Sequence, residues 1–453
     1  MLEHRFLPTT EQDRKEMLAA CGIKNIEDLL NGIPKNLRFK NQLSITEGLS
    51  EMEIKRKLNL LFKNSRNKKN ALSFIGAGVY DHFCPSVVNQ LTLRGEFLTS
   101  YTPYQPEFSQ GTLQSLFEFQ SMIAEIFDMD VSNASHYDGA TSMAEAVLMG
   151  LRIKKNRKRI LISKGVHPEY VEVLKTYLTN LGVEVSLIPV DENGVTSNDS
   201  LRNMLDENVA LAIVQSPNFF GCIENMKLLS NMVHSKEALF VSNITEPLSL
   251  SLFTAPGEYQ ADIAIGEGQS FGLPQSFGGP YLGLFTSRID YVRQMPGRLC
   301  GETIDAQGKR SFTLTLSTRE QHIRREKATS NICTNQNLCA LWASIWLALV
   351  GKSGFVELGE QNLAKSEYAK TELLKTGKVK LRYPNSLSFN EFIIDLNLSS
   401  KEFISKCIEL NFVPGVSLER FYPEDKNGLL VAVTEKKTRD EIDKLVDIFK
   451  KFG

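Results

Sequence analysis

The stretch "DIAIGEGQSFGLPQSFGGPYLGLF", residues 262–285, holds the pattern that decides the fold. It begins with an apolar, β-rich run, passes through a polar turn and a loop rich in glycine and proline, and closes with a second strand-like run. Glycine and proline mark loops because they favour backbone angles that interrupt strands and helices. The stretch therefore predicts a strand, a tight loop at its end, and a second strand.

Similar apolar runs precede this stretch, and helical patterns separate them. The runs are "RILISKG" (159–165), "VEVSLIPV" (183–190), "VALAIVQ" (209–215) and "ALFVSNI" (238–244). Short, mostly apolar strands between helices are typical of a largely parallel sheet that is buried on both faces. The sequence therefore predicts an α/β fold, in which ligands bind at the carboxyl ends of the strands.

Composition limits the class of protein. Apolar residues make up 42% and charged residues 23% of the 453 residues, as in an ordinary globular protein of two or three domains. The net charge of −1 gives no electrostatic reason to expect nucleic acid or a membrane surface as a partner. The start of the chain is charged and lacks the apolar core of an export signal. The longest apolar run, "CALWASIWLALV" (339–350), is shorter than a membrane span and predicts a buried helix.

The seven cysteines are scattered and form no CxxC pair. This distribution argues against a disulfide framework and against a zinc site, so we expect no metal. A reducing compartment such as the cytoplasm fits it best.

Three regions follow from these patterns. Residues 1–70 predict a helical N-terminal arm, in which Thr10 and a Ser50–Glu53 capping box begin two helices. Residues 71–335 predict the large α/β domain. Residues 336–453 predict a long helix and a small α+β domain with strands near "SFNEFIIDL" and "GLLVAVT" and a final amphipathic helix.

The loop after residue 268 has the layout of a strand end that carries the lysine of a pyridoxal-phosphate (PLP) enzyme. Such a site needs that lysine, an acid for the pyridinium nitrogen, a flat side chain over the ring and a helix N-terminus for the phosphate. The helix that starts near Thr141 could receive the phosphate, although ordinary helix capping explains it as well. His167 follows a strand where a ring-stacking residue could lie, although it could equally be an ordinary loop histidine.

The two remaining positions lack the required groups. The acid is expected at the end of "ALFVSNI", where the sequence has Asn243, a neutral amide that cannot balance a protonated pyridine. The lysine is expected at the end of "DIAIGEGQ", where the sequence has Gln269. The loop is thus present without the residue that could bind the cofactor covalently.

Five stretches together resemble one family. They are "YTPYQPEFSQGTLQSLFEFQ" (101–120), "SNASHYDGATSMAEA" (132–146), "VQSPNFFG" (214–221), "GEGQSFGLPQSFGGPYLG" (266–283) and "RREKATSNICTNQNL" (324–338). The chain resembles the P-protein of the glycine cleavage system, glycine dehydrogenase (decarboxylating), and specifically the alpha subunit (subunit 1) of its split form. The resemblance covers nearly the whole chain and implies the fold of PLP-dependent transferases of the aspartate aminotransferase type (fold type I).

The resemblance also implies which residues have been replaced. The cofactor half of that family carries a His-Lys-Thr-Phe turn followed by a proline and a glycine run. Gln269 falls on the lysine, Ser270 on the threonine, Phe271 on the phenylalanine and Pro274 on the proline, and Asn243 falls on the acid. This half of the enzyme therefore resembles a copy that kept the scaffold and binds no cofactor, with a degenerate site at Gln269, Asn243, His167 and Thr141.

The implied reaction is shared between chains. PLP is expected on a partner, subunit 2 (beta), where glycine loses its carboxylate as CO₂; the aminomethyl group then passes to the lipoyl group of the H-protein. The T- and L-proteins of the same system are further implied partners. We expect this chain to contribute to the partner's pocket through residues of the irregular "YTPYQPE" segment, namely Tyr101, Tyr104, Gln105 and Glu107.

Alternative interpretations remain at this stage. The "YTPYQPE" segment could pack at an interface without touching substrate, and the chain could be a structural or regulatory subunit that only stabilises its partner. A third interpretation is a self-sufficient PLP enzyme that uses another lysine, such as Lys164.

Overall fold

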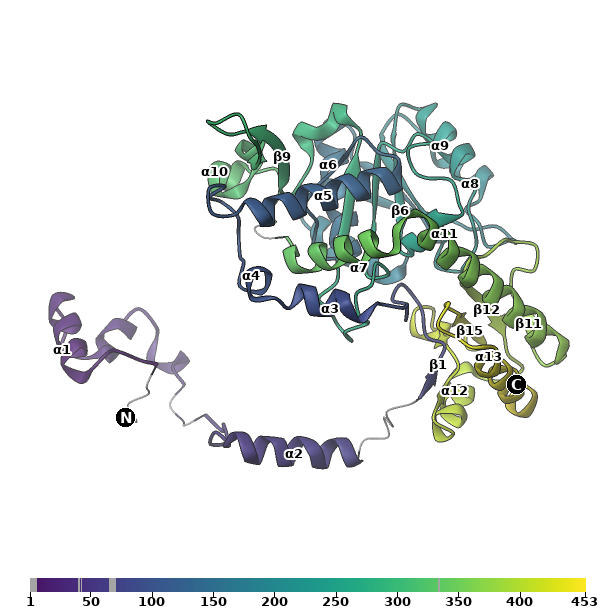
Figure 1. Ribbon diagram of the computed structural model, residues 1–453, viewed down its shortest axis with the longest axis horizontal. Coiled ribbons are helices and arrows are strands. Elements are labelled where there is room, and N and C mark those ends of the chain that lie inside the picture. Colours follow the sequence, from purple (N-terminus) through teal and green to yellow (C-terminus); the bar gives the residue numbers. More distant parts are fainter. Residues whose placement is uncertain (1–5, 40, 42, 65–70, 333–334) are drawn as a thin grey trace. The chain divides into compact units, whose positions relative to one another are not determined.

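The computed structural model describes residues 6–39, 41, 43–64, 71–332 and 335–453, and it divides into two compact units, residues 1–66 and 67–453 (Figure 1). The first unit consists of helices α1 (Glu11–Ala20) and α2 (Glu51–Asn64) and the 3-10 helices η1 (Ile26–Leu30) and η2 (Lys35–Leu37). Thr10 caps α1, and Ser50 and Glu53 exchange hydrogen bonds as predicted. No described residue of this unit is buried, so it has no core of its own. Its predicted end, residue 70, lies outside the described residues.

A seven-stranded sheet forms the centre of the second unit. Its strands are β2 (Val131–Ser132), β3 (Arg159–Ser163), β4 (Glu184–Ile188), β5 (Val209–Gln215), β6 (Leu239–Ile244), β7 (Ile263–Glu267) and β8 (Gly283–Ser287). They lie in the order β2-β8-β7-β6-β5-β3-β4. The five strands β3, β4, β5, β6 and β7 are parallel to one another, and β7 pairs antiparallel with β8. Every residue of β5 to β8 is buried, which explains the uninterrupted apolar runs. The predicted α/β fold is confirmed.

Helices cover both faces of this sheet. They are α5 (Gln110–Phe127), α6 (Gly139–Ile153), α7 (Pro168–Leu178), α8 (Asn198–Met204), α9 (Met226–His234) and α11 (Asn337–Lys375). Neighbouring residues of β5 belong to two separate apolar clusters. Ala212 packs in a cluster with residues of α5, α9 and α11, whereas Ile213 packs in a cluster with residues of α6 and α7. Because successive strand residues point to opposite faces, the two groups of helices lie on opposite sides of the sheet.

Helix α11 contains the apolar run 339–350, which is mostly buried up to Trp346, whereas Ala348 and Leu349 are exposed. Trp346 is fully buried in the cluster shared with α5, and the helix is interrupted at Gly351, where φ is 61°. Among the described residues α11 is the one helix long and apolar enough to cross a membrane, judged by length and composition alone.

The C-terminal part forms a small antiparallel sheet with two covering helices. Its strands lie in the order β11 (Lys380–Leu381), β12 (Glu391–Asp395), β15 (Gly428–Ala432) and β14 (Val416–Ser417), and its helices are α12 (Ser400–Glu409) and α13 (Arg439–Phe452). The short strand β1 (Leu72–Ser73) pairs with β13 (Phe412–Val413). The chain therefore enters the second unit beside the C-terminal part and returns to the large sheet through residues 74–85. The predicted boundary between residues 335 and 336 stays a prediction.

The hairpin of β9 (Leu299–Ile304) and β10 (Arg310–Thr315) packs against α5, and α3 (Ser86–Thr92) packs against α11. The short helix α4 (Gly95–Leu98) follows α3, and α10 (Gln321–Arg324) lies beside the hairpin (Figure 1). The sequence patterns did not predict the hairpin.

Candidate functional site

The residues of the degenerate site gather at the carboxyl ends of the parallel strands. Gln269 follows β7, Asn243 lies in β6, His167 follows β3, and Thr141 lies in the first turn of α6. The Gln215 side chain links two of them, because its Oε1 accepts hydrogen bonds from the His167 N–H (2.9 Å) and the Asn243 amide (3.0 Å). Two of the four predicted residues, His167 and Asn243, are thus joined through Gln215 at the strand ends.

The Gln269 side chain is fully used by the protein itself. Its Oε1 accepts the Tyr80 N–H at 2.9 Å, and its Nε2 donates to the carbonyl oxygens of Tyr80 (2.9 Å) and Leu273 (2.8 Å). A buried amide with all these partners is well satisfied. Gln269 therefore anchors the 76–83 segment, a stretch that sequence reasoning did not connect with the site.

The same segment covers His167. The imidazole Nε2 is 3.0 Å from the Ala77 carbonyl oxygen, and Nδ1 accepts the Glu169 N–H at 3.2 Å at the start of α7. Nε2 therefore carries the proton, and burial lowers the pKa of this histidine, so the ring is neutral. A Cβ on Gly78 would lie 3.1 Å from the ring. The 76–83 segment thus binds the Nε2 edge of the ring, while the face of the ring stacks on Tyr170, with the ring centroids 5.1 Å apart.

The first turn of α6 is also satisfied internally. Thr141 and Asp138 form a capping box, in which the Thr141 N–H donates to the Asp138 carboxylate at 2.7 Å. The Gly139 N–H donates to the buried carboxylate of Glu267 at 3.0 Å. The two N–H groups that a phosphate would use at this helix end already bind carboxylates of the chain.

These residues do not fit PLP. Gln269 offers no amine, Asn243 offers no carboxylate, the 76–83 segment covers His167, and the N-terminus of α6 is already bonded to acidic side chains. The buried Oδ1 of Asn243 has no hydrogen-bond partner. No group of three or more His, Cys, Asp or Glu side chains suited to a metal ion is found among the described residues.

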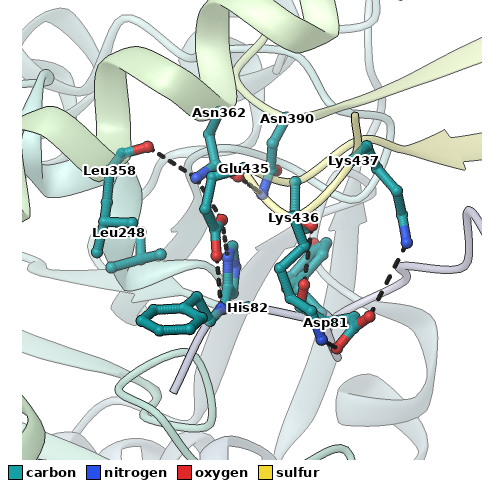
Figure 2. Close-up of polar contacts among 12 residues, drawn as sticks. Asp81, His82, Leu248, Leu358, Asn362, Asn390, Glu435, Lys436 and Lys437 are labelled. Atoms are coloured by element: carbon teal, nitrogen blue, oxygen red, sulfur yellow. Dashed lines mark hydrogen bonds and ion pairs between the residues drawn. The ribbon is translucent and has the colours of Figure 1, made fainter. Parts of the chain in front are cut away.

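A buried histidine fixes the 76–83 segment to both parts of the second unit. His82 Nε2 is 2.8 Å from Glu246, which follows β6, and Nδ1 is 2.7 Å from Glu435, which follows β15. Figure 2 shows Glu435 and Asn362 beside His82, and the Asn362 amide donates to Glu435 at 2.9 Å. Burial acts to lower the pKa of His82, but the two glutamates raise it to about 10. His82 is therefore an imidazolium paired with two carboxylates.

Replacing His82 with Gln is expected to destabilise the chain by about 3–5 kcal/mol at pH 7, because two buried carboxylates lose their counter-charge. The raised pKa means that the stabilisation is complete below pH 6.5 and is lost as the pH rises through about 10. Urea unfolding at pH 7 and pH 10 measures both effects. His234→Gln is the matched control, since His234 pairs with one carboxylate and its side chain is 28% exposed. An equal loss in both variants would contradict the prediction.

The "YTPYQPE" segment forms a second candidate site. Tyr101 is 79% exposed and Tyr104 is 47% exposed. Gln105 and Glu107 are also exposed. The Tyr104 hydroxyl accepts a hydrogen bond from Arg298 at 3.3 Å.

The groups beneath Tyr104 are buried and charged. The Arg298 side chain is 3% exposed, donates to Asn335 at 3.3 Å and lies 3.7 Å from Glu320. The His322 ring lies 5.0 Å from the Tyr104 ring, and Asn337 donates to the Tyr101 carbonyl oxygen at 2.9 Å. Sequence reasoning missed Arg298 and Glu320, although it singled out the 324–338 stretch that supplies both asparagines.

The fold defines a protein of the PLP-dependent enzyme type, fold type I. Two solved structures of low sequence identity have the same fold. A NifS-like protein is 13% identical with a TM-score of 0.62, and the match covers 84% of this chain and 99% of that one. Sphingosine-1-phosphate lyase from Burkholderia pseudomallei is 12% identical with a TM-score of 0.64, covering 92% and 94%.

The chain belongs to the glycine cleavage system P-protein family, because the sequence model of that family matches residues 4–449. Probable glycine dehydrogenase (decarboxylating) subunit 1 from Moorella thermoacetica is 48% identical over 441 residues, 97% of this chain and 98% of the relative. The protein of the same name from Geobacillus sp. (strain WCH70) is 46% identical over 443 residues, 98% of each. A crystal structure of glycine decarboxylase (P-protein) in inhibitor-bound form is 39% identical with a TM-score of 0.87, covering 99% of this chain and all of that one. The predicted family is confirmed.

Proposed function

We propose that this chain is the subunit of a two-subunit glycine dehydrogenase (decarboxylating) that binds no PLP, and that a second subunit carries the cofactor. The observation that carries the proposal is Gln269, which lies where the cofactor lysine would be and whose amide is saturated by the protein. The full-length relatives named subunit 1 support the two-subunit assembly. On the partner, PLP supplies the electron sink for loss of CO₂ from glycine.

A self-sufficient enzyme using Lys164 is less well supported. Lys164 follows β3 and is exposed, whereas Gln269 is 1% exposed. An exposed lysine is not fixed beside the buried strand-end residues, where PLP would have to bind. The second subunit is therefore the better candidate for the cofactor lysine.

The contribution of this chain to catalysis is assigned to the surface of Tyr101, Tyr104, Gln105 and Glu107. Aromatic and hydrogen-bonding side chains are exposed there, and the buried Arg298 holds Tyr104 from beneath. Preorganised groups of this kind position a substrate with little loss of conformational freedom. We infer that this surface completes the glycine pocket of the partner, from which the aminomethyl group passes to the lipoylated H-protein.

Tyr104→Phe and Glu107→Gln are expected to lower the kcat of glycine-dependent CO₂ exchange about tenfold or more in the assembled enzyme, a loss of at least about 1.4 kcal/mol. Assembly should be unchanged, because both substitutions keep the size of the side chain. Glu118→Gln, at an exposed position of α5, is the matched control. In the same preparation, borohydride should fix PLP to the second subunit.

Normal kcat with weaker assembly would favour the alternative, a structural or regulatory subunit that touches no substrate. PLP fixed to this chain would refute the division of labour. The cytoplasmic location and the connection to the T- and L-proteins stay predictions.

A further inference from the structure

The carboxylate of Glu267 has an unusual set of partners. Its Oε2 accepts the Gly139 N–H at 3.0 Å, and its Oε1 accepts the N–H groups of Leu282 (2.9 Å) and Gln269 (3.1 Å). These donors come from the first turn of α6, the residue before β8 and the loop after β7. Three converging backbone N–H groups, one at a helix N-terminus, are the arrangement with which proteins bind phosphate.

We propose that Glu267 is a built-in replacement for a bound phosphate, so that this chain fills its own anion site and folds without a cofactor. The proposal concerns the stability of the chain and goes beyond its role in the assembled enzyme. Burial raises the pKa of Glu267 above its ordinary value, while the three N–H donors act in the opposite direction. All three hydrogen-bond contacts are with donors, which suits an ionised carboxylate, because a protonated oxygen would need an acceptor.

Packing leaves no room for a second anion beside Glu267. A Cβ on Gly139 would lie 2.3 Å from the Tyr170 hydroxyl, and a Cβ on Gly283 would lie 2.5 Å from both the Asp138 carbonyl oxygen and the Ser142 hydroxyl. The Asp138 carboxylate binds the Thr141 N–H in the same helix turn. A phosphate at this position would therefore face the carboxylates of Glu267 and Asp138, and the close packing at Gly139 and Gly283 would leave it no space.

The 76–83 segment completes the replacement. The Ala77 carbonyl binds the Nε2 edge of His167, and the Tyr80 backbone binds Gln269, so the segment bridges two residues that a cofactor would otherwise contact. The Tyr80 hydroxyl donates to Glu391 of β12 at 2.9 Å. Glu267 and this segment together use the polar groups that a phosphate and its ring would otherwise satisfy.

The test removes the carboxylate and offers inorganic phosphate. At pH 8 and constant ionic strength, the thermal midpoint of the full-length Glu267→Ala chain should lie below that of wild type and rise saturably with phosphate by roughly 3–5 °C. Wild type should show no saturable rise. Glu267→Gln keeps the volume and should also melt earlier, but without a phosphate response, because its amide fills the site.

A second measurement covers the case in which Glu267→Ala does not fold. Hydrogen exchange of the assembled Glu267→Gln enzyme should be at least tenfold faster than wild type at the first turn of α6, and unchanged in α13. Equal phosphate responses in wild type and Glu267→Ala would overturn the proposal. Unchanged exchange at α6 in Glu267→Gln would overturn it as well.

Discussion

The Gln269→Lys chain is expected to form no stable lysine-bound PLP and to be less stable than wild type. Gln269 both accepts the Tyr80 N–H and donates to two carbonyl oxygens. A lysine side chain has no acceptor, so the Tyr80 N–H would be buried without a partner at a cost of about 1–3 kcal/mol. The 76–83 segment would still lie against His167. The amine would thus reach a place that is already filled.

A cofactor forced into this place would also lack its acid. Asn243 stands at the position of the carboxylate, and a neutral amide does not keep a pyridine nitrogen protonated. An unmatched member of a buried charge pair costs on the order of 3–5 kcal/mol, so the ring would release its proton. This penalty corresponds to a loss of some two to four orders of magnitude in a step that depends on the charged ring.

To test this, the variant is mixed with PLP and dialysed, and its absorbance reports any lysine-bound PLP that remains. Borohydride reduction followed by mass spectrometry then shows whether PLP is attached to the chain. Gln275→Lys is the matched control, because it adds a lysine to the same loop without removing the bonds of Gln269. The Asn243→Asp, Gln269→Lys double variant should bind PLP better than either single variant only if the 76–83 segment withdraws. Glycine-dependent CO₂ exchange by the Gln269→Lys chain alone, at a rate near that of the two-subunit enzyme, would show that only the lysine had been lost.

The central sheet was predictable because its strands are buried on both faces. β5 was predicted with its observed bounds and β6 within one residue at its start, since their runs are mostly apolar. β9 and β10 were missed because their residues are mostly half-buried or exposed, so they leave no apolar run. Two-residue strands such as β13 carry no recognisable pattern at all.

The predicted site rests on residues whose types carry the chemistry. Gln269 and Asn243 were singled out because their types exclude the roles of lysine and acid, and this assignment stays a prediction. Glu267 lies two residues from Gln269, and sequence reasoning passed over it, because a single glutamate does not reveal three N–H donors from separate elements. The contact between Gln269 and Tyr80 spans 189 residues, and no local pattern in the 76–83 segment predicts it.

The His82 network was hidden for the same reason. His82 lies 164 residues from Glu246 and 353 residues from Glu435, and each residue alone would be expected at the surface. His82 is buried with its two glutamates because the large sheet, which supplies Glu246, packs beside the C-terminal part, which supplies Glu435. Sequence reasoning could therefore name candidate residues for the degenerate site but could not predict the long-range contacts that the 76–83 segment makes with Gln269 and His167.

Loss of subunit assembly is the second large effect, expected when the apolar face of α2 is made polar. Ile54, Leu58, Leu61 and Phe62 follow the spacing of one helical face, and they are 43%, 46%, 59% and 71% exposed. No described residue of the first unit is buried, so this face has no partner within its own unit. We expect it to bind the second, PLP-carrying subunit, because obligate interfaces resemble a divided core.

Leu58→Gln combined with Leu61→Gln should weaken assembly by some two to four orders of magnitude, since each leucine side chain contributes about 1.5–3 kcal/mol when fully buried. Arg56→Gln combined with Lys63→Gln is the matched control, because these residues lie on the opposite face of the same helix and receive the same new side chain. Light scattering of each variant co-expressed with the second subunit gives the mass of the complex. The leucine variant should elute as separate subunits while the control elutes as the complex. Because α2 belongs to the first unit, in which no described residue is buried, the separated leucine variant should unfold at the same urea concentration as the separated wild-type chain. A complex of normal mass and affinity in the leucine variant would show that α2 does not lie at the subunit interface.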